Sequence, residues 1–297
     1  RLEAVVACSD IHSANSMVVA AKAASHPMDR FINFALTQTV HALAPQWHPA
    51  LSQGKLNFDN PAGLIYVLRA YGGKDVTGQV RGLIQSEEIS AAGRRELLRL
   101  LARVGTANDL RTVFSHAQND PELLQSLPNI ASGRRLVPAG VIHAKLAILL
   151  TSKNTGIRAS AARLAGLWKQ RQLIPLLEPF VDSKENDEVR AAAIRSLAEL
   201  SPDTAVKTFQ PLITPKHSAP IYLAALESVA TQAIDAASMA ALKLLTELDD
   251  ADSFSPVLGI IMNRRGAAQA VARELKQADI SADDAKLISR WLSAAGH

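Results

Sequence analysis

Apolar side chains recur at spacings of three and four residues along most of the chain, which is the pattern of amphipathic helices. In the second half, this pattern itself repeats every 32 residues. The segment 156–168, GIRASAARLAGLW, aligns with 188–200, EVRAAAIRSLAEL, so that Arg158 falls on Arg190. Two further shifts of the same length keep the apolar positions apolar. The period therefore predicts one helix that recurs in successive units.

The segments between these helices share the same period. Leu177, Phe209 and Ala241 are again 32 residues apart, and Ser238 is the one polar residue among the equivalent apolar positions. Because two separate apolar faces share one period, each unit is predicted to be a pair of helices that cannot bury its own apolar surface. Stacked pairs would share a continuous core. We therefore expect an all-α fold, an α-α superhelix or solenoid of about 7–9 helix pairs.

The first half is predicted to be helical without this strict period. Apolar spacing and turn residues predict helices over residues 13–24, 29–43, 61–71, 76–85, 91–104 and 107–117. The chain would then consist of irregular helical repeats (1–126), a turn-rich joint (127–142) and regular 32-residue repeats with a C-terminal cap (143–297). We expect one continuous solenoid. A last helix is predicted over 282–294, with Leu287 and Trp291 on its buried side.

Composition supports helix packing. Of the 297 residues, 48% are hydrophobic but only 4% aromatic, and Ala and Leu pack helices closely. No apolar run reaches the roughly 18–20 residues that span a bilayer, so we expect no membrane insertion. The opening string RLEAVVA already lies in an apparent helix, so we expect a fragment of a larger multidomain protein. Cys8 is the one cysteine, which suits both a reducing cytoplasm and a disulfide-free exported protein.

Several strings resemble known proteins. VRAAAIRSLAEL and IRASAARLAGLW resemble the second helix of HEAT repeats, which are armadillo-like helical scaffolds. RLEAVVA, HPMDRFINFALTQTVHAL, PQWHPAL and DNPAGLIYVLRAYGG, all within residues 1–73, resemble the HEAT-like segment of large multidomain proteins in planctomycetes. In that family, the segment follows a dehydrogenase-like propeller and precedes a haem-binding domain of cytochrome c type.

This resemblance implies export to the periplasm, whereas the residues alone also suit the cytoplasm. The chain carries no CxxCH motif. We therefore expect no cofactor in this segment, and any haem would lie elsewhere in the parent protein.

Motifs for catalysis or metal binding are missing from the sequence. It has no HExxH, GxSxG, GxxxxGK[ST] or GxGxxG string. His41 and His48 are seven residues apart, but Pro45 separates them, so a shared helix face is not expected. Cys8 is predicted to be a buried apolar side chain. Adjacent acids at 87–88, 249–250 and 283–284 are predicted to be solvated charges, and 249–252 lacks the loop pattern of a calcium site. We expect no catalytic, cofactor or metal site.

The candidate binding residues are basic. Four arginines repeat at the 32-residue spacing and would form a ladder along a stack of helices: Arg158, Arg163, Arg190 and Arg195. The ladder could bind phosphate or an acidic peptide. Alternatively, it could pair adjacent repeats through polar groups of the preceding turn, such as Asp187, which is the commoner use in HEAT-like repeats. A second basic helix face is predicted to be solvated: Arg94, Arg95, Arg99 and Arg103.

Three functions remain open. The first is a non-catalytic scaffold that binds proteins or neighbouring domains of the same polypeptide. The second is a helical-repeat protein that binds nucleic acid, which requires a concentrated basic groove with aromatic side chains. A net charge of +4, three Trp and three Tyr argue against it. The third is a structural segment of a haem-containing dehydrogenase-like redox protein. We expect the scaffold, and no enzyme activity in this segment.

Overall fold

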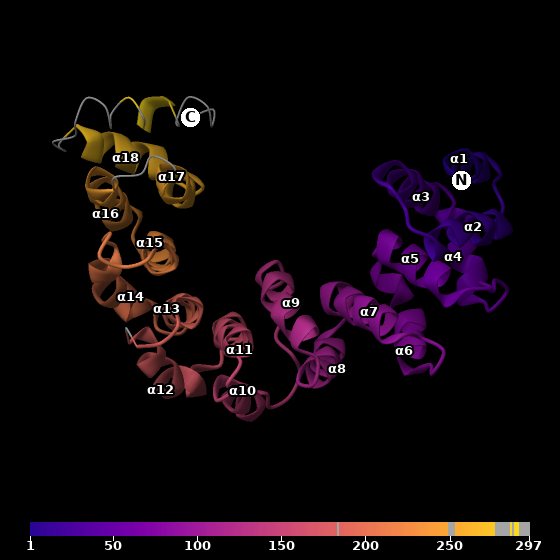
Figure 1. The fold of residues 1–297 in the computed structure, drawn as a ribbon, viewed down its shortest axis with the longest axis horizontal. Helices are drawn as coiled ribbons and strands as arrows, with labels where there is room; N and C mark the ends of the chain where they lie inside the picture. Colours follow the sequence, from indigo (N-terminus) through magenta and orange to yellow (C-terminus); the bar gives the residue numbers. More distant parts are fainter. Residues whose placement is uncertain (183, 249–252, 277–285, 287, 291–297) are drawn as a thin grey trace. The chain divides into compact units, whose positions relative to one another are not determined.

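A computed structural model describes residues 1–182, 184–248, 253–276, 286 and 288–290. Over these residues the chain is built from helices and contains no β-strand. The helices form two compact units, residues 1–139 and 140–297 (Figure 1). The expected all-α class of stacked helix pairs is confirmed. None of the described helices combines the length and the apolar content needed to cross a bilayer.

Unit 1, which is described in full, consists of helices in two rows. The odd-numbered helices follow one another on one side and the even-numbered helices on the other (Figure 1). We call these the odd row and the even row. The helices are α1 (Leu2–Asp10), α2 (Ala14–Ala21), α3 (Arg30–Ala42), α4 (Ala44–Ser52), α5 (Pro61–Tyr71), α6 (Thr77–Gln85), α7 (Ala91–Val104), α8 (Ala107–Ala117) and α9 (Pro121–Ser132). The 3₁₀ turns η1 (Lys22–Ser25) and η2 (Lys74–Val76) follow α2 and precede α6.

The odd row of unit 1 has a period of its own. Helices α3, α5, α7 and α9 begin at residues 30, 61, 91 and 121, which are 31, 30 and 30 residues apart. The helices are thus spaced more regularly than the apolar pattern of the first half predicts. The period is shorter than the 32 residues found in the second half, so a search for 32-residue shifts does not detect it.

Side-chain caps explain where several helices of unit 1 begin. Asp29, Asn60, Ser90 and Thr106 precede α3, α5, α7 and α8, and each accepts a hydrogen bond from a backbone N–H of the first turn. Gly72 ends α5 in the left-handed conformation, with φ at 64°, which glycine adopts at low cost. These local signals are strong, and the predicted bounds of α5, α7 and α8 are confirmed at both ends.

Prolines lie inside two stretches whose helices the sequence pattern did not predict. Helix α3 ends at Ala42, close to the predicted end at 43, but Pro45 lies in the first turn of a further helix, α4, where the missing N–H removes no helical hydrogen bond. The expected joint, 127–142, overlaps α9, which continues to Ser132 with Pro128 inside it. The non-helical connection is therefore residues 133–142, and the boundary between the two units falls within it.

The core of unit 1 lies between its two rows. Met17, Leu36, Trp47, Leu97 and Phe114 are almost completely buried there. Each such side chain contributes roughly 1.5–3 kcal/mol through removal of apolar surface from water. The indole N–H of Trp47 donates to the carbonyl oxygen of Val40 at 2.8 Å, which satisfies its polar group inside the core.

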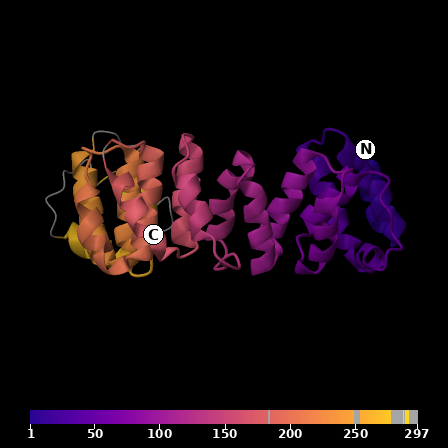
Figure 2. The same cartoon turned by 90° about the horizontal axis from the view of Figure 1, so that it is seen from below.

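Unit 2 also forms two rows, and its described helices stand side by side (Figures 1 and 2). They are α10 (His143–Leu150), α11 (Thr155–Leu167), α12 (Ile174–Leu177), α13 (Asp187–Leu200), α14 (Pro202–Phe209), α15 (Ala219–Gln232), α16 (Ile234–Glu247), α17 (Phe254–Met262) and α18 (Ala267–Leu275), with 3₁₀ turns η3 (Arg171–Leu173), η4 (Glu178–Val181) and η5 (Gln210–Leu212). Helices α11, α13 and α15 begin at residues 155, 187 and 219. The predicted 32-residue period is confirmed.

Small side chains bring α11 and α13 close together. A Cβ atom on Gly166 would lie 2.7 Å from the Cα atom of Ser196, so the position has no room for a side chain. The hydroxyl of Ser196 donates to the carbonyl oxygen of Ala162 at 2.7 Å and ties the two helices together. Ser238, the polar exception in the apolar pattern, is also fully buried.

The predicted last helix, 282–294, lies mostly outside the described residues, as do Leu287 and Trp291. Of that range, residues 286 and 288–290 are described and helical, and Ile288 is buried.

Candidate functional site

The four ladder arginines lie on α11 and α13, and each one meets a carboxylate of the protein. Arg158 lies 2.7 Å from Glu185 in the turn before α13, and it also donates to the carbonyl oxygen of Ser152 at 2.9 Å. Arg163 of α11 lies 2.6 Å from Glu199 of α13. All three of these pairing side chains, Arg158, Glu185 and Arg163, are less than a quarter exposed. These contacts connect one repeat to the next.

Of the two arginines on α13, Arg190 binds within its own repeat and Arg195 binds the next repeat. Arg190 is only 6% exposed, and its guanidinium donates to Val181 of the preceding turn and to Asp187, both at 3.3 Å. The contact with Asp187 is the one that the sequence suggested. Arg195 lies 2.7 Å from Glu227 of α15, 32 residues later in the chain. The geometry supports the inter-repeat interpretation for Arg158, Arg163 and Arg195 but not for Arg190. Ligand binding by these arginines stays a prediction.

The second basic face, on α7, is not simply solvated. Arg94 donates to the carbonyl oxygens of Ile84 and Ser86 at 2.9 and 2.8 Å, which are unpaired acceptors at the end of α6. Arg95 and Arg99 enter a charged network described below. The prediction of a solvated face is therefore wrong for these three side chains, because α6 and α9 pack beside α7 and offer acceptors. No ion pair or hydrogen bond of Arg103 is described, so its side chain still fits the prediction.

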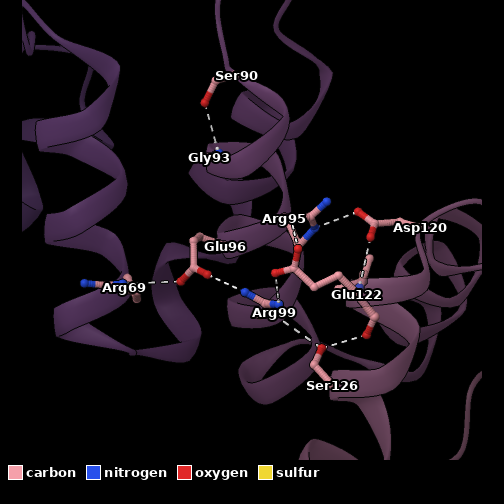
Figure 3. Close-up of polar contacts among 10 residues, drawn as sticks. Arg69, Ser90, Gly93, Arg95, Glu96, Arg99, Asp120, Glu122 and Ser126 are labelled. Atoms are coloured by element: carbon pink, nitrogen blue, oxygen red, sulfur yellow. Dashed lines mark hydrogen bonds and ion pairs between the residues drawn. The ribbon is translucent and has the colours of Figure 1, made fainter. Parts of the chain in front are cut away.

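The charged network joins three successive helices of the odd row (Figure 3). Glu96 of α7 pairs with Arg69 of α5 at 3.3 Å and with Arg99 at 2.6 Å. Arg99 continues to Glu122 of α9 at 2.9 Å. Arg95 reaches Asp120 at 2.8 Å and also contacts Glu122. Positive and negative groups thus alternate from α5 to α9, and both guanidinium groups on α7 bind α9.

A sequence signal for this network exists. Arg69 and Glu96, Arg95 and Glu122, and Arg158 and Glu185 are each 27 residues apart. In unit 1, with a period near 30, this offset places the acid about one helical turn before the equivalent position in the next repeat. In unit 2 the period is 32, so Glu185 lies five residues before that position, in the turn that precedes α13. A search for Arg and Glu 27 residues apart could have found all three pairs.

The network lowers the pKa values of two of its carboxyl groups. Burial raises the pKa of Glu96, but hydrogen bonds from Arg99 and Arg69 outweigh burial and leave the pKa below its ordinary value. For Asp120, burial is again the largest single cause and raises the pKa, but the hydrogen bond and charge of Arg95 together with the backbone N–H groups of Leu123 and Glu122 outweigh burial and lower the pKa. Both carboxylates are therefore ionised over the physiological pH range and serve as permanent acceptors.

A separate ion pair in the even row contains the carboxyl group whose pKa departs furthest from its ordinary value. One edge of the Arg81 guanidinium on α6 donates two hydrogen bonds to the carboxylate of Asp109 on α8, from Nε at 2.6 Å and from Nη2 at 2.8 Å. The same carboxylate accepts from the backbone N–H of Thr106 at 2.7 Å and completes a capping box. The bond from Arg81 is the largest cause that lowers the pKa of Asp109, to about 2.

His41 and His48 both lie near the ring of Tyr71. His41 on α3 and His48 on α4 both lie beside Tyr71, with ring centroids 6.3 and 5.4 Å from its ring. Asp75 approaches Nε2 of His48 at 3.1 Å and accepts from the hydroxyl of Tyr71 at 3.0 Å. The two histidines lie on different helices, so they share no helix face, as expected, and Tyr71 contacts both. Among the described residues, no group of three or more His, Cys, Asp or Glu side chains could hold a metal ion.

The remaining candidates are Cys8 and the adjacent acids. Cys8 is buried as predicted, and burial raises the pKa of its thiol, which makes it a poor nucleophile. Glu87 and Glu88 are exposed. The acid pairs at 249–250 and 283–284, and the segment 249–252, lie outside the described residues.

Comparison with known proteins fits this geometry. Residues 144–230 match the family of HEAT repeats. The match begins in α10 and ends in α15, which is the part of the chain with the confirmed 32-residue period. HEAT repeats typically mediate protein–protein interactions. No curated protein matches the chain.

Proposed function

We propose that this chain is a non-catalytic scaffold that holds proteins or neighbouring domains of its own polypeptide at set positions. The observation that carries this proposal is the pairing of charges between repeats. Arginines on α7, α11 and α13 bind carboxylates of the next repeat, and these bonds tie adjacent helices of a row to one another. A stack tied in this way presents its exposed side chains in a defined order along each unit.

The wider context is part of the same proposal. The resemblance of residues 1–73 to segments of planctomycete multidomain proteins supports an exported, periplasmic parent with a dehydrogenase-like propeller and a cytochrome c-type domain. In such a parent, this segment would position the haem domain and would carry no cofactor itself. Partners would then be flanking domains rather than nucleic acid or membrane.

Titration calorimetry tests the scaffold role. The 297-residue chain would be titrated with each flanking domain of the parent, expressed separately. We expect heat that saturates at a one-to-one ratio with at least one flank. Absence of heat with every flank would reject the interdomain role.

The arginine ladder can be tested in the same titration. The double variant Arg163→Gln/Arg195→Gln removes two guanidinium groups that already have carboxylate partners. If the ladder only pairs repeats, the affinity for the flanking domain stays within about two-fold of the unmodified chain. A loss of ten-fold or more would instead assign the ladder to ligand binding.

A further inference from the structure

An apolar groove of about 700 Å³ runs between α1 and α3 at one end of the odd row. Its walls carry four large exposed apolar side chains: Leu2 (39% exposed), Val6 (48%), Phe31 (57%) and Phe34 (67%). Single exposed apolar residues are ordinary on protein surfaces, but a contiguous group around a concave groove marks an interaction site.

These four side chains are not needed for the core of unit 1. Helix α1 already buries Val5 and Cys8, and α3 buries Ile32 and Leu36. Both helices therefore carry a second apolar face, which a helix with one buried stripe does not require. The second face is directed into the groove.

Further along the odd row, ion pairs join adjacent helices. Between α5 and α7 the gap is bridged by Arg69 and Glu96, and between α7 and α9 by Arg99 and Glu122 (Figure 3). No ion pair joins α1 to α3, both of which are described throughout. The α1–α3 gap thus offers apolar surface where the α5–α7 and α7–α9 gaps offer paired charges, and the intervening α3–α5 gap is bridged by hydrogen bonds from the hydroxyl of Tyr66 to Asn33.

One cation stands at an end of the groove. The guanidinium of Arg30 lies 4.7 Å from the ring centroid of Phe31, an arrangement that leaves its N–H groups available. Arg30 makes no ion pair with a described residue, and none of the residues that line the groove is acidic. The far end is polar and uncharged, with Ser9 and Gln38. A complementary partner is therefore apolar with a carboxylate at one end.

We infer that this groove docks an amphipathic helix from a partner protein, with apolar side chains three or four residues apart and an acidic residue that pairs with Arg30. The inference rests on the proposed scaffold function and names its partner chemistry. Phe31 and Phe34 are three residues apart and Leu2 and Val6 four apart, so each wall is a helical ridge into which such side chains interdigitate. From Arg30 to Gln38 the groove extends about 12 Å, so two to three turns of partner helix fill it.

The geometry of the groove favours a helix of a partner protein, rather than a lipid surface, as its occupant. Binding to an anionic membrane uses several cations around a protruding apolar face. Here the apolar side chains surround a groove that contains one cation, Arg30.

Fluorescence anisotropy with defined peptides tests the inference. The probes are Ala-rich 16-residue helical peptides with two Leu residues spaced by three, four or seven positions and one Glu a turn before the first Leu. We expect saturable one-to-one binding to the 297-residue chain by the peptide with spacing three or four. Phe34→Ser should weaken it at least ten-fold. Ile148→Ser, which alters an apolar residue of α10 that is 71% exposed, should leave it unchanged.

A charge exchange supplies the specific control. Arg30→Glu should weaken binding of the Glu peptide, and the same variant should bind a peptide with Lys in place of Glu more tightly than the unmodified chain does. Circular dichroism of each variant would confirm that the fold is kept.

Several outcomes would overturn the inference. The first is that no peptide shows saturable binding, and the second is that Ile148→Ser weakens binding as much as Phe34→Ser does. The third is a concentration-dependent dimer of the chain that Phe34→Ser abolishes. The fourth is Phe34-dependent binding to vesicles of phosphatidylcholine and phosphatidylserine without binding to any peptide. The scaffold function is judged separately: if a flanking domain still gives heat with the Phe34→Ser variant while all peptides fail, the scaffold stands and the groove is rejected.

Discussion

Units 1 and 2 connect their repeats by different means. In unit 1, alternating charges cross from α5 to α7 and from α7 to α9, through Arg69, Glu96, Arg99 and Glu122. In unit 2, α11 and α13 approach so closely that Gly166 has no space for a methyl group, and the ion pairs lie beside this contact. Both units therefore use ion pairs between repeats, and unit 2 adds a close contact between small residues.

The difference explains why the repeat is easier to see in the second half of the sequence than in the first. Close packing requires a small residue at the same position of each repeat, so the 32-residue period of α11, α13 and α15 is visible in the sequence. Long arginine and glutamate side chains reach across gaps of varied width. The period of 30–31 residues in unit 1 is therefore weakly marked in its apolar pattern.

The largest effect is expected from loss of the polar connection in the even row of unit 1. Asp109→Ala removes the bidentate partner of Arg81 and half of the capping box with Thr106. We expect a loss of about 2–3 kcal/mol in the free energy of unfolding. Hydrogen exchange measured by mass spectrometry should show faster exchange in α6 and α8. The exposed Asp10→Ala should change stability by less than about 0.5 kcal/mol.

The same carboxylate predicts a pH dependence. Because the folded-state pKa of Asp109 is lowered from 3.8 to about 2, the unfolded chain binds its proton more readily. The stabilisation is present above about pH 4 and is lost as the pH falls toward 2. Urea unfolding of the unmodified chain and of Asp109→Asn should therefore converge between pH 4 and about 2. A constant difference over that range would contradict the pairing.

An intermediate effect is expected at the close contact in unit 2. Gly166→Ala places a methyl group 2.7 Å from the Cα of Ser196 and should destabilise by about 1–3 kcal/mol. The same substitution at Gly259 in α17, where no atom lies within 4 Å of the new Cβ, should stabilise by about 0.5–1 kcal/mol. Chemical denaturation of both variants measures the two effects. If Gly166→Ala does not destabilise the protein, α11 and α13 are not in tight contact.

The smallest effect is expected from replacement of single glutamates in the two units. Glu122→Gln in unit 1 removes contacts to both Arg95 and Arg99, whereas Glu227→Gln in unit 2 removes a contact to Arg195 alone. Both acids are well exposed, so we expect about 1 kcal/mol for the first and only a few tenths for the second. Added NaCl should reduce the difference, because screening weakens exposed pairs. If the two losses are equal, the network of unit 1 has no advantage over an isolated pair.

Local signals in the sequence determined much of the fold. Caps at Asn60, Ser90 and Thr106 and the glycine at Gly72 set the ends of α5, α7 and α8, because a cap acts within a few residues of the backbone it stabilises. The 32-residue period predicted the stacked pairs of unit 2, since two apolar faces with one period must be buried by neighbours. Proline was the incomplete signal: α3 ends before Pro45 as predicted, but Pro45 also lies in the first turn of α4.

Only the tertiary structure decided which groups meet. The apolar pattern places Leu36 and Phe34 alike as apolar residues of α3, yet Leu36 is fully buried and Phe34 is two-thirds exposed. The charge pattern likewise left the arginines on α7 as a solvated face, whereas α6 and α9 supply their acceptors. The physical reason is common to both cases: spacing along a helix fixes the direction of a side chain, but what lies there depends on a neighbouring helix that is distant in the sequence.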